Sequence, residues 1–105
     1  GNGEYMGITA TESNAGKEIT INVSGRFDFS CHQDFIKAFK ARPKGEIKFV
    51  VDLSGTEYMD SSALGMLLQL REHSSKDQKV SLINANESVQ EILTIANFDK
   101  LFDIG

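Results

Sequence analysis

The chain has 105 residues, of which 40% are hydrophobic and 25% are charged, and its formal net charge is −4. These values are typical of one globular domain, 1–105, and the acidic balance argues against general nucleic-acid binding. The single cysteine, Cys31, excludes an internal disulfide, and no apolar run approaches the ~18 residues of a membrane span. We therefore expect a cytoplasmic protein. We give no functional weight to residues 1–4, whose composition is typical of a tag remnant or a disordered terminus.

The first half of the chain predicts a hairpin followed by a helix. Residues 4–11 and 18–25 are rich in β-branched residues, and the second segment alternates apolar and polar residues as a half-buried strand does. The turn-forming residues 12–17 between them predict a hairpin. Ser30 is expected to cap a helix that runs to about Ala41.

The second half predicts strands that alternate with helices. Residues 46–55 contain consecutive apolar residues, typical of a strand buried on both faces. A loop and a helix to about Ser74 should follow, then a short strand, a third helix and a final short strand near residues 101–105. Strands joined through helices become parallel neighbours. We therefore predict an α/β domain with a mixed sheet of about four or five strands packed with about three helices.

The predicted second helix is apolar over an arc of about 200°, twice the ~100° that one buried face needs. Either the helix is covered on two sides, or one edge, Met66 or Leu64 with Leu68, faces a partner protein. Gly65 lies on the polar side. Glycine there costs about 1 kcal/mol relative to alanine, so we look for a reason such as close approach by another backbone.

Asp60, Ser61 and Ser62 stand directly before this helix. A side-chain oxygen at that place can accept a backbone N–H, which stabilises by about 1 kcal/mol. A phosphate there would also face unpaired N–H groups and the positive end of the helix dipole, so the fold could accept it. Capping is the ordinary interpretation, and the residues alone leave both open.

The sequence gives little support for catalytic, metal or cofactor chemistry. A nucleophilic Ser61 would need His32 or His73 as its base, and His73 is twelve residues further on, about 18 Å along the helix. The sequence contains no Gly-x-Ser-x-Gly elbow, no glycine-rich phosphate loop and no metal-ligand spacing. We therefore expect no enzyme activity, no metal and no cofactor.

Residues 52–72 resemble the signature of the STAS domain, specifically that of bacterial anti-sigma factor antagonists. Members typically have a strand ending in Asp-Leu, a short loop, and then Asp-Ser-(Ser/Thr)-Gly-Leu-Gly. Here the strand ends in Asp52 and Leu53, and residues 60–65 read Asp-Ser-Ser-Ala-Leu-Gly. Ala63 stands where the family usually has glycine. Residues 23–29 and 89–104 are similar to further parts of the family pattern.

The resemblance implies a STAS fold and a binding module that exchanges partners. The unphosphorylated domain would bind an anti-sigma factor that is also a serine-protein kinase, which frees a sigma factor or another client. The kinase would phosphorylate Ser61 and weaken the complex, a PP2C-type phosphatase would restore binding, and Ser62 would be a second cap or support. The implied partner-binding residues are Asp28, Phe29, Asp60, Ser62, Ala63, Leu64, Gly65 and Met66. In an alternative interpretation, the domain is a subunit of a transporter or another signalling complex and its serine is not phosphorylated.

Overall fold

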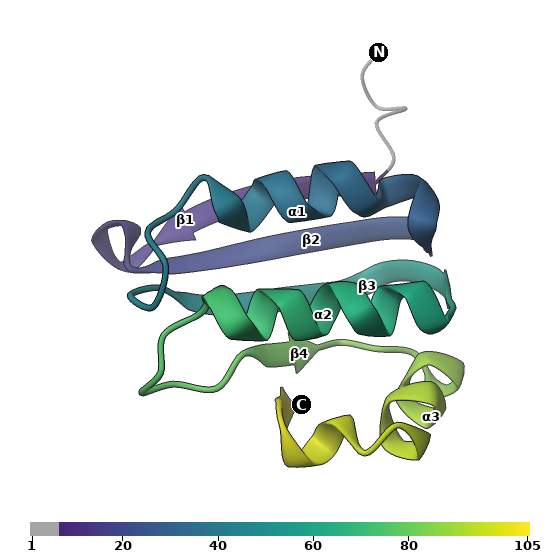
Figure 1. Cartoon of the computed structure of the whole chain (residues 1–105). Helices are drawn as coiled ribbons and strands as arrows, with labels where there is room; N and C mark the ends of the chain where they lie inside the picture. Colours follow the sequence, from purple (N-terminus) through teal and green to yellow (C-terminus); the bar gives the residue numbers. More distant parts are fainter. Residues whose placement is uncertain (1–6) are drawn as a thin grey trace.

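The computed structural model describes residues 7–105 and confirms an α/β domain with a mixed five-stranded sheet (Figure 1). Residues 1–4, to which we gave no functional weight, lie outside the described residues. The main elements are β1 (Gly7–Ser13), β2 (Glu18–Phe27), α1 (His32–Lys40), β3 (Lys48–Met59), α2 (Ser61–His73), β4 (Ser81–Ile83), α3 (Glu87–Ile95) and β5 (Asp103–Ile104). Short 3-10 turns are η1 (Asn14–Gly16), η2 (Phe29–Cys31) and η3 (Phe98–Lys100).

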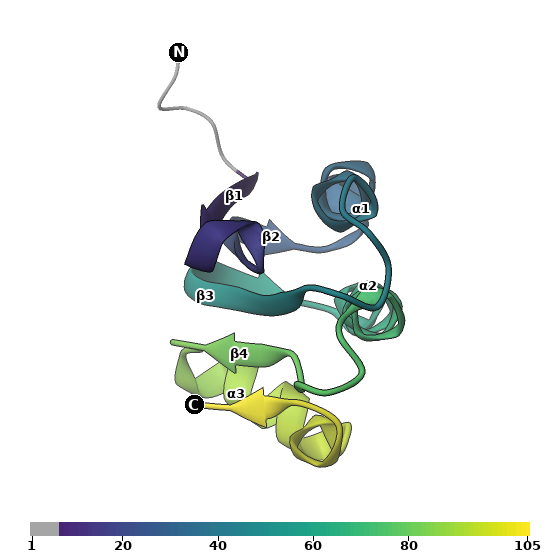
Figure 2. The same cartoon turned by 90° about the vertical axis from the view of Figure 1, so that its left-hand side faces the viewer.

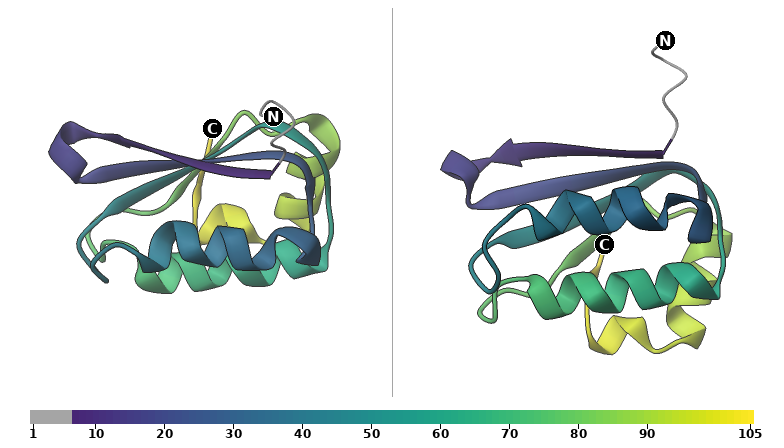
Figure 3. Two further views of the ribbon diagram at one scale, coloured as in Figure 1. Left: turned by 90° about the horizontal axis from the view of Figure 1, so that it is seen from above. Right: turned by 45° about the horizontal axis from the view of Figure 1, so that its top comes forward.

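The strands follow one another across the sheet in the order β1-β2-β3-β4-β5. β1 and β2 form the expected antiparallel hairpin, and all later pairs are parallel. Successive crossovers advance in the same direction, and such crossovers are right-handed. For that reason α1 and α2 lie together on one face of the sheet (Figures 2 and 3). α3 lies beside the carboxyl-terminal half of β3, where the Asn86 amide donates to the Thr56 carbonyl at 3.2 Å.

The core lies between the sheet and these two helices. The apolar positions of β2 pair with those of β3, Ile19 with Phe49 and Ile21 with Val51, so that one row of side chains faces α1 and α2. Each fully buried side chain of this size contributes about 1.5–3 kcal/mol. The helices complete the core with Phe35, Phe39, Ala63, Met66, Leu67 and Leu70.

The loop predicted before the second helix is wrong, because β3 continues to Met59. The predicted strand covers only residues 46–55. In the structure Gly55 pairs with Ser24 of β2, and a Cβ at Gly55 would lie 2.8 Å from the Ser24 hydroxyl oxygen. The glycine therefore permits close contact between two strands instead of ending one. The pairing of β2 and β3 shifts register here, and the buried Thr56 hydroxyl donates to the Val23 carbonyl at 2.9 Å.

Candidate functional site

The candidate site lies at the carboxyl ends of β2 and β3. These parallel strands end together, with Phe27 paired to Met59. One further backbone hydrogen bond, from the Asp60 N–H to the Phe27 carbonyl at 3.4 Å, follows the last pair. The strand pairing therefore places Asp28 and Asp60, which are 32 residues apart in sequence, at neighbouring positions.

Both aspartates cap the turn that follows them, and they do so in the same way. Asp60 Oδ1 accepts the Ser62 backbone N–H at 3.0 Å and the Ser62 hydroxyl at 2.6 Å. Asp28 Oδ1 accepts the corresponding groups of Ser30 at 3.0 and 2.5 Å. Each cap satisfies a donor that the first turn would otherwise leave unpaired.

These contacts correct the expectation about Ser30. Ser30 does not cap α1. It donates to Asp28 within η2, and α1 begins at His32 without a side-chain cap hydrogen bond. Ser62, expected to be a second cap or a support, supports the cap by donating its N–H and its hydroxyl to Asp60 Oδ1. In both places the aspartate carboxylate is a stronger hydrogen-bond acceptor than the serine hydroxyl, because the carboxylate is charged.

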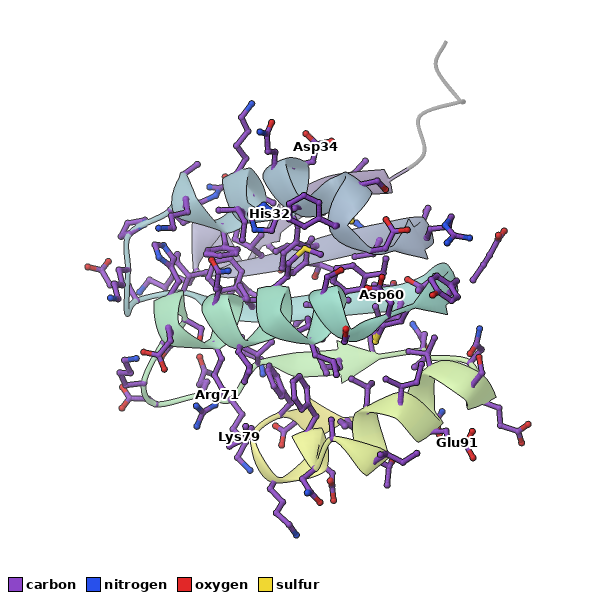
Figure 4. All side chains as sticks on the ribbon, turned by 45° about the vertical axis from the view of Figure 1, so that its right-hand side comes forward. His32, Asp34, Asp60, Arg71, Lys79 and Glu91 are labelled. Atoms are coloured by element: carbon purple, nitrogen blue, oxygen red, sulfur yellow. The ribbon has the colours of Figure 1, made fainter. Side chains whose placement is uncertain are left out.

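Ser61 is the first residue of α2, and it is exposed. The hydrogen bonds between Asp60 and Ser62 fix the backbone on either side of Ser61. Among residues 7–105, the Ser61 side chain makes no hydrogen bond of its own. Its hydroxyl therefore stands at a defined position, accessible to another protein. Figure 4 shows Asp60 at this end of α2, with Arg71 at the other.

Phe29 follows Asp28 as Ser61 follows Asp60, so the two lie at equivalent positions after neighbouring strands. The Phe29 side chain is 70% exposed, although large aromatic side chains are usually buried. Its ring stacks on His32, with centroids 5.1 Å apart and planes 24° from parallel. This contact holds an apolar ring at the surface, directly after the cap on Asp28.

An exposed stripe continues from Ser61 along α2. Gly65 and Leu68 are exposed and Leu64 is half-buried, at the spacing of one helix face. A Cβ at Gly65 would meet nothing within 4 Å. No contact within the described chain therefore requires a glycine at this position.

The structure decides which edge of α2 reaches the surface. Met66 is only 1% exposed and Ala63 is fully buried, so both belong to the core. The resemblance implies both as partner-binding residues, but neither side chain reaches the surface of the domain, because α2 packs on the sheet through this side of the helix. The edge with Leu64 and Leu68 is the one that faces solvent.

Sequence reasoning missed Arg26 and Tyr58. Arg26 Nε lies 3.1 Å from Asp28 Oδ2, and the guanidinium lies 4.4 Å from the centroid of the Tyr58 ring. Hydrogen bonds from Ser30, assisted by Arg26, lower the pKa of Asp28 below its ordinary value. Only the pairing of β2 with β3 brings Arg26 and Tyr58 together, so no local motif could have indicated them.

His73 is not placed to act as a base for Ser61. His73 lies at the far end of α2, where its Nε2 is 2.7 Å from the Arg42 carbonyl. Cys31 is buried, and burial raises the pKa of its thiol. Across residues 7–105, no group of three or more His, Cys, Asp or Glu side chains could hold a metal ion.

A family model described as "Mlab, STAS domain" matches residues 10–103. The chain belongs to the STAS family. It is 48% identical over 101 residues to a STAS-domain containing protein of Pseudomonas aeruginosa (strain UCBPP-PA14), a match that covers 95% of this chain and 100% of that protein.

Solved structures share the STAS fold at low sequence identity. A candidate anti-sigma factor antagonist of Thermotoga maritima matches with a TM-score of 0.77 and 19% identity, over 92% of this chain and 84% of that one. An anti-sigma factor antagonist of Mycobacterium paratuberculosis gives 0.72 and 20% over the same shares. The antagonist SpoIIAA in its unphosphorylated form gives 0.62 and 16%, over 84% and 82% of the two chains. Among the described residues of this STAS chain, no helix is long and apolar enough to span a membrane.

Proposed function

We propose that this STAS protein is an anti-sigma factor antagonist, a binding module whose affinity is controlled by phosphorylation of Ser61. The observation that carries the proposal is the exposed serine at the capped start of α2, bordered by Phe29 and by the exposed stripe of that helix. The unphosphorylated surface binds an anti-sigma factor that is also a serine kinase. Binding removes that factor from its client, in the cytoplasm.

Phosphorylation changes this surface without disturbing the core. A phosphate on Ser61 adds about −1.5 to −2 charge next to Asp60 and near Asp28. The start of the helix can accommodate the group, since N–H groups and the helix dipole favour an anion there. The Ser61 side chain is exposed, so no buried contact is broken.

The same phosphate weakens docking for two physical reasons. Leu64, Leu68 and Phe29 give the surface an apolar part, and an anion brought into a dry apolar contact loses hydration. The phosphate also stands next to Asp60 and near Asp28, and like charges brought together within an interface cost several kcal/mol. Every 1.4 kcal/mol is about tenfold in affinity. A PP2C-type phosphatase reverses the change.

The structural neighbours support this reading. The proteins from Mycobacterium paratuberculosis and SpoIIAA are described as anti-sigma factor antagonists, and SpoIIAA is described in an unphosphorylated form. Their likeness to this chain is one of fold. The specific role therefore rests on the surface around Ser61, which no catalytic, metal or cofactor chemistry explains better.

The test needs candidate anti-sigma factors with a serine-kinase domain from the same organism, including any that are encoded beside the gene for this protein. Each purified kinase is incubated with the protein and ATP, and the modified residue is mapped by mass spectrometry. We expect phosphate on Ser61, loss of binding in Ser61→Asp and retained binding in Ser61→Ala. Ser62→Ala is the matched control and should still be phosphorylated at Ser61. Modification of Ser62, or of neither serine, would refute the assignment.

The same experiment separates this function from the alternative. A STAS subunit of a transporter or another complex would copurify with that complex whether residue 61 is serine, alanine or aspartate. Binding that is unaffected by Ser61→Asp therefore favours the alternative, and binding that it abolishes favours the antagonist.

A further inference from the structure

Exposed apolar side chains occur near the carboxyl ends of β2 and β3 and on α2, the helix that begins with Ser61. Four large hydrophobic residues of the described chain are exposed, and three of them, Phe29, Tyr58 and Leu68, belong to the ends of β2 and β3 or to α2. Phe29 is held by His32 and Tyr58 by Arg26. Exposed aromatic rings fixed in this way are typical anchors of a protein contact.

The charges around these side chains have one sign. The carboxyl end of the domain comprises residues 25–34, 55–65 and 84–92. It contains one guanidinium and six carboxylates, a formal sum of −5, while the whole chain sums to −4. The rest of the chain therefore sums to +1, so the net negative charge is concentrated at this end. The six acidic residues are Asp28, Asp34, Glu57, Asp60, Glu87 and Glu91.

The cations lie at the other end. Ten of the eleven lysines and arginines occupy the β1–β2 hairpin, the second half of α1, the end of α2, the loops that precede β3 and β4, the start of β3, and η3. Arg26 is the exception. Figure 4 shows this separation, with Arg71 and Lys79 at the opposite end of the domain from Asp60 and Glu91.

The acidic side chains at the carboxyl end are little neutralised within the protein. Arg26 with Asp28 is the one ion pair there among residues 7–105. The backbone caps account for Asp28 and Asp60, whereas Glu57, Glu87 and Glu91 are exposed. These three carboxylates make no ion pair among residues 7–105, so they are available to act on a partner.

We propose that the surface around Ser61 binds a protein face with an apolar centre and a rim of lysine and arginine. Charge complementarity defines this occupant, because an acidic rim attracts a basic one and repels nucleic acid and anionic membranes. The proposal relies on the proposed function only for the position of the docking surface. The rim accelerates encounter, and the apolar centre with Ser61 decides how long the complex lasts.

The distinction between centre and rim also explains how one added charge can weaken binding to a basic partner. Rim charges remain hydrated and act at a distance within the Debye length of about 8 Å. A phosphate on Ser61 would lie at the apolar centre, where contact removes its water. The rim therefore attracts the partner while the modified centre rejects it.

The test uses two synthetic helical peptides with the same leucine face, one with lysine and one with glutamate on its polar face. Amide chemical shifts of the ¹⁵N-labelled protein locate the binding site. We expect the lysine peptide to shift amides around Phe29, Tyr58, Ser61 and Leu68, and the glutamate peptide to bind at least about tenfold more weakly. Equal binding of both peptides, or shifts confined to the basic end, would overturn the proposal.

A pair of matched triple variants isolates the rim. Removing three charges at the carboxyl end, by Glu57→Gln, Glu87→Gln and Glu91→Gln, should weaken the lysine peptide about five- to tenfold at low salt and flatten its salt dependence. Removing three negative charges at the other end, by Glu46→Gln, Glu72→Gln and Asp77→Asn, should leave the affinity for the lysine peptide within about twofold of that of the parent. Equal effects of the two triples would overturn the proposal. Neither result depends on phosphorylation, so the switch at Ser61 can fail while the basic partner face stands.

Discussion

Asp28 and Asp60 make the same cap on adjacent strands, each accepting the N–H and the hydroxyl of the serine two residues later. The residue between cap and serine is Phe29 in one case and Ser61 in the other. Because the local geometry is shared, an exposed ring and an exposed hydroxyl occupy equivalent positions after the two strands. The pair defines a surface that is both apolar and open to modification.

The Asp60 cap should matter for stability and Ser61 should not. Asp60→Ala leaves the Ser62 N–H without its acceptor, so we expect the free energy of unfolding to fall by about 1 kcal/mol. Ser61→Ala removes an exposed hydroxyl and should stay within about 0.5 kcal/mol of the parent. Urea unfolding measures both. Equal losses in the two variants would contradict the assignment of the cap.

Gly65→Ala should stabilise the isolated domain and weaken the complex. The new methyl meets nothing within 4 Å, and alanine is favoured over glycine in a helix by about 1 kcal/mol. A partner backbone that approaches Gly65 would clash with it, so affinity for the kinase should drop. Gly55→Ala is the control, and it should destabilise the fold because its Cβ would lie 2.8 Å from the Ser24 hydroxyl. Unchanged affinity in Gly65→Ala would mean that the glycine has no role in docking.

Phe29→Ala should impair binding far more than folding. The ring is 70% exposed, so its loss should change the free energy of unfolding by no more than about 0.5 kcal/mol. As an anchor it should contribute tenfold or more to affinity, about 1.4 kcal/mol. Ile95→Ala removes a side chain that is 76% exposed on α3 and serves as the control. Calorimetry against the kinase should show a loss for Phe29 alone, and equal losses would locate the docking surface elsewhere.

Acid should destabilise the protein through Asp52 and Asp28. The Ser54 N–H, with help from the Asn84 amide, lowers the pKa of Asp52 below its ordinary 3.8. A carboxyl with a lowered pKa in the folded state contributes stability above the unfolded value of 3.8, and this is lost as pH falls through the lower folded value. Asp52→Asn should therefore show a shallower decline of unfolding free energy between pH 5 and pH 2. A curve parallel to that of the parent would exclude this carboxyl as a source of the acid sensitivity.

Local patterns in the sequence were sufficient for most of the secondary structure. The alternation in residues 18–25 predicted a half-buried strand, and the structure buries Ile19, Ile21 and Val23 on one face of β2. The start of α2 was also predictable, since Asp60, Ser61 and Ser62 are consecutive and a cap depends on neighbours in the chain. The hydrophobic period and the capping residues act over a few positions, so they can be interpreted without the fold.

Only the tertiary structure decided what these elements present to a partner. Position 55 of β3 is a glycine because Ser24, on the neighbouring strand, occupies the space that a Cβ would need. Met66 is buried and Leu68 is exposed because α2 packs on the sheet through one particular side. The nearness of Asp28 to Asp60 and the gathering of acidic groups at one end have the same origin. Each depends on the register of parallel strands and on the face through which a helix packs, and these relations join residues that are far apart in the chain.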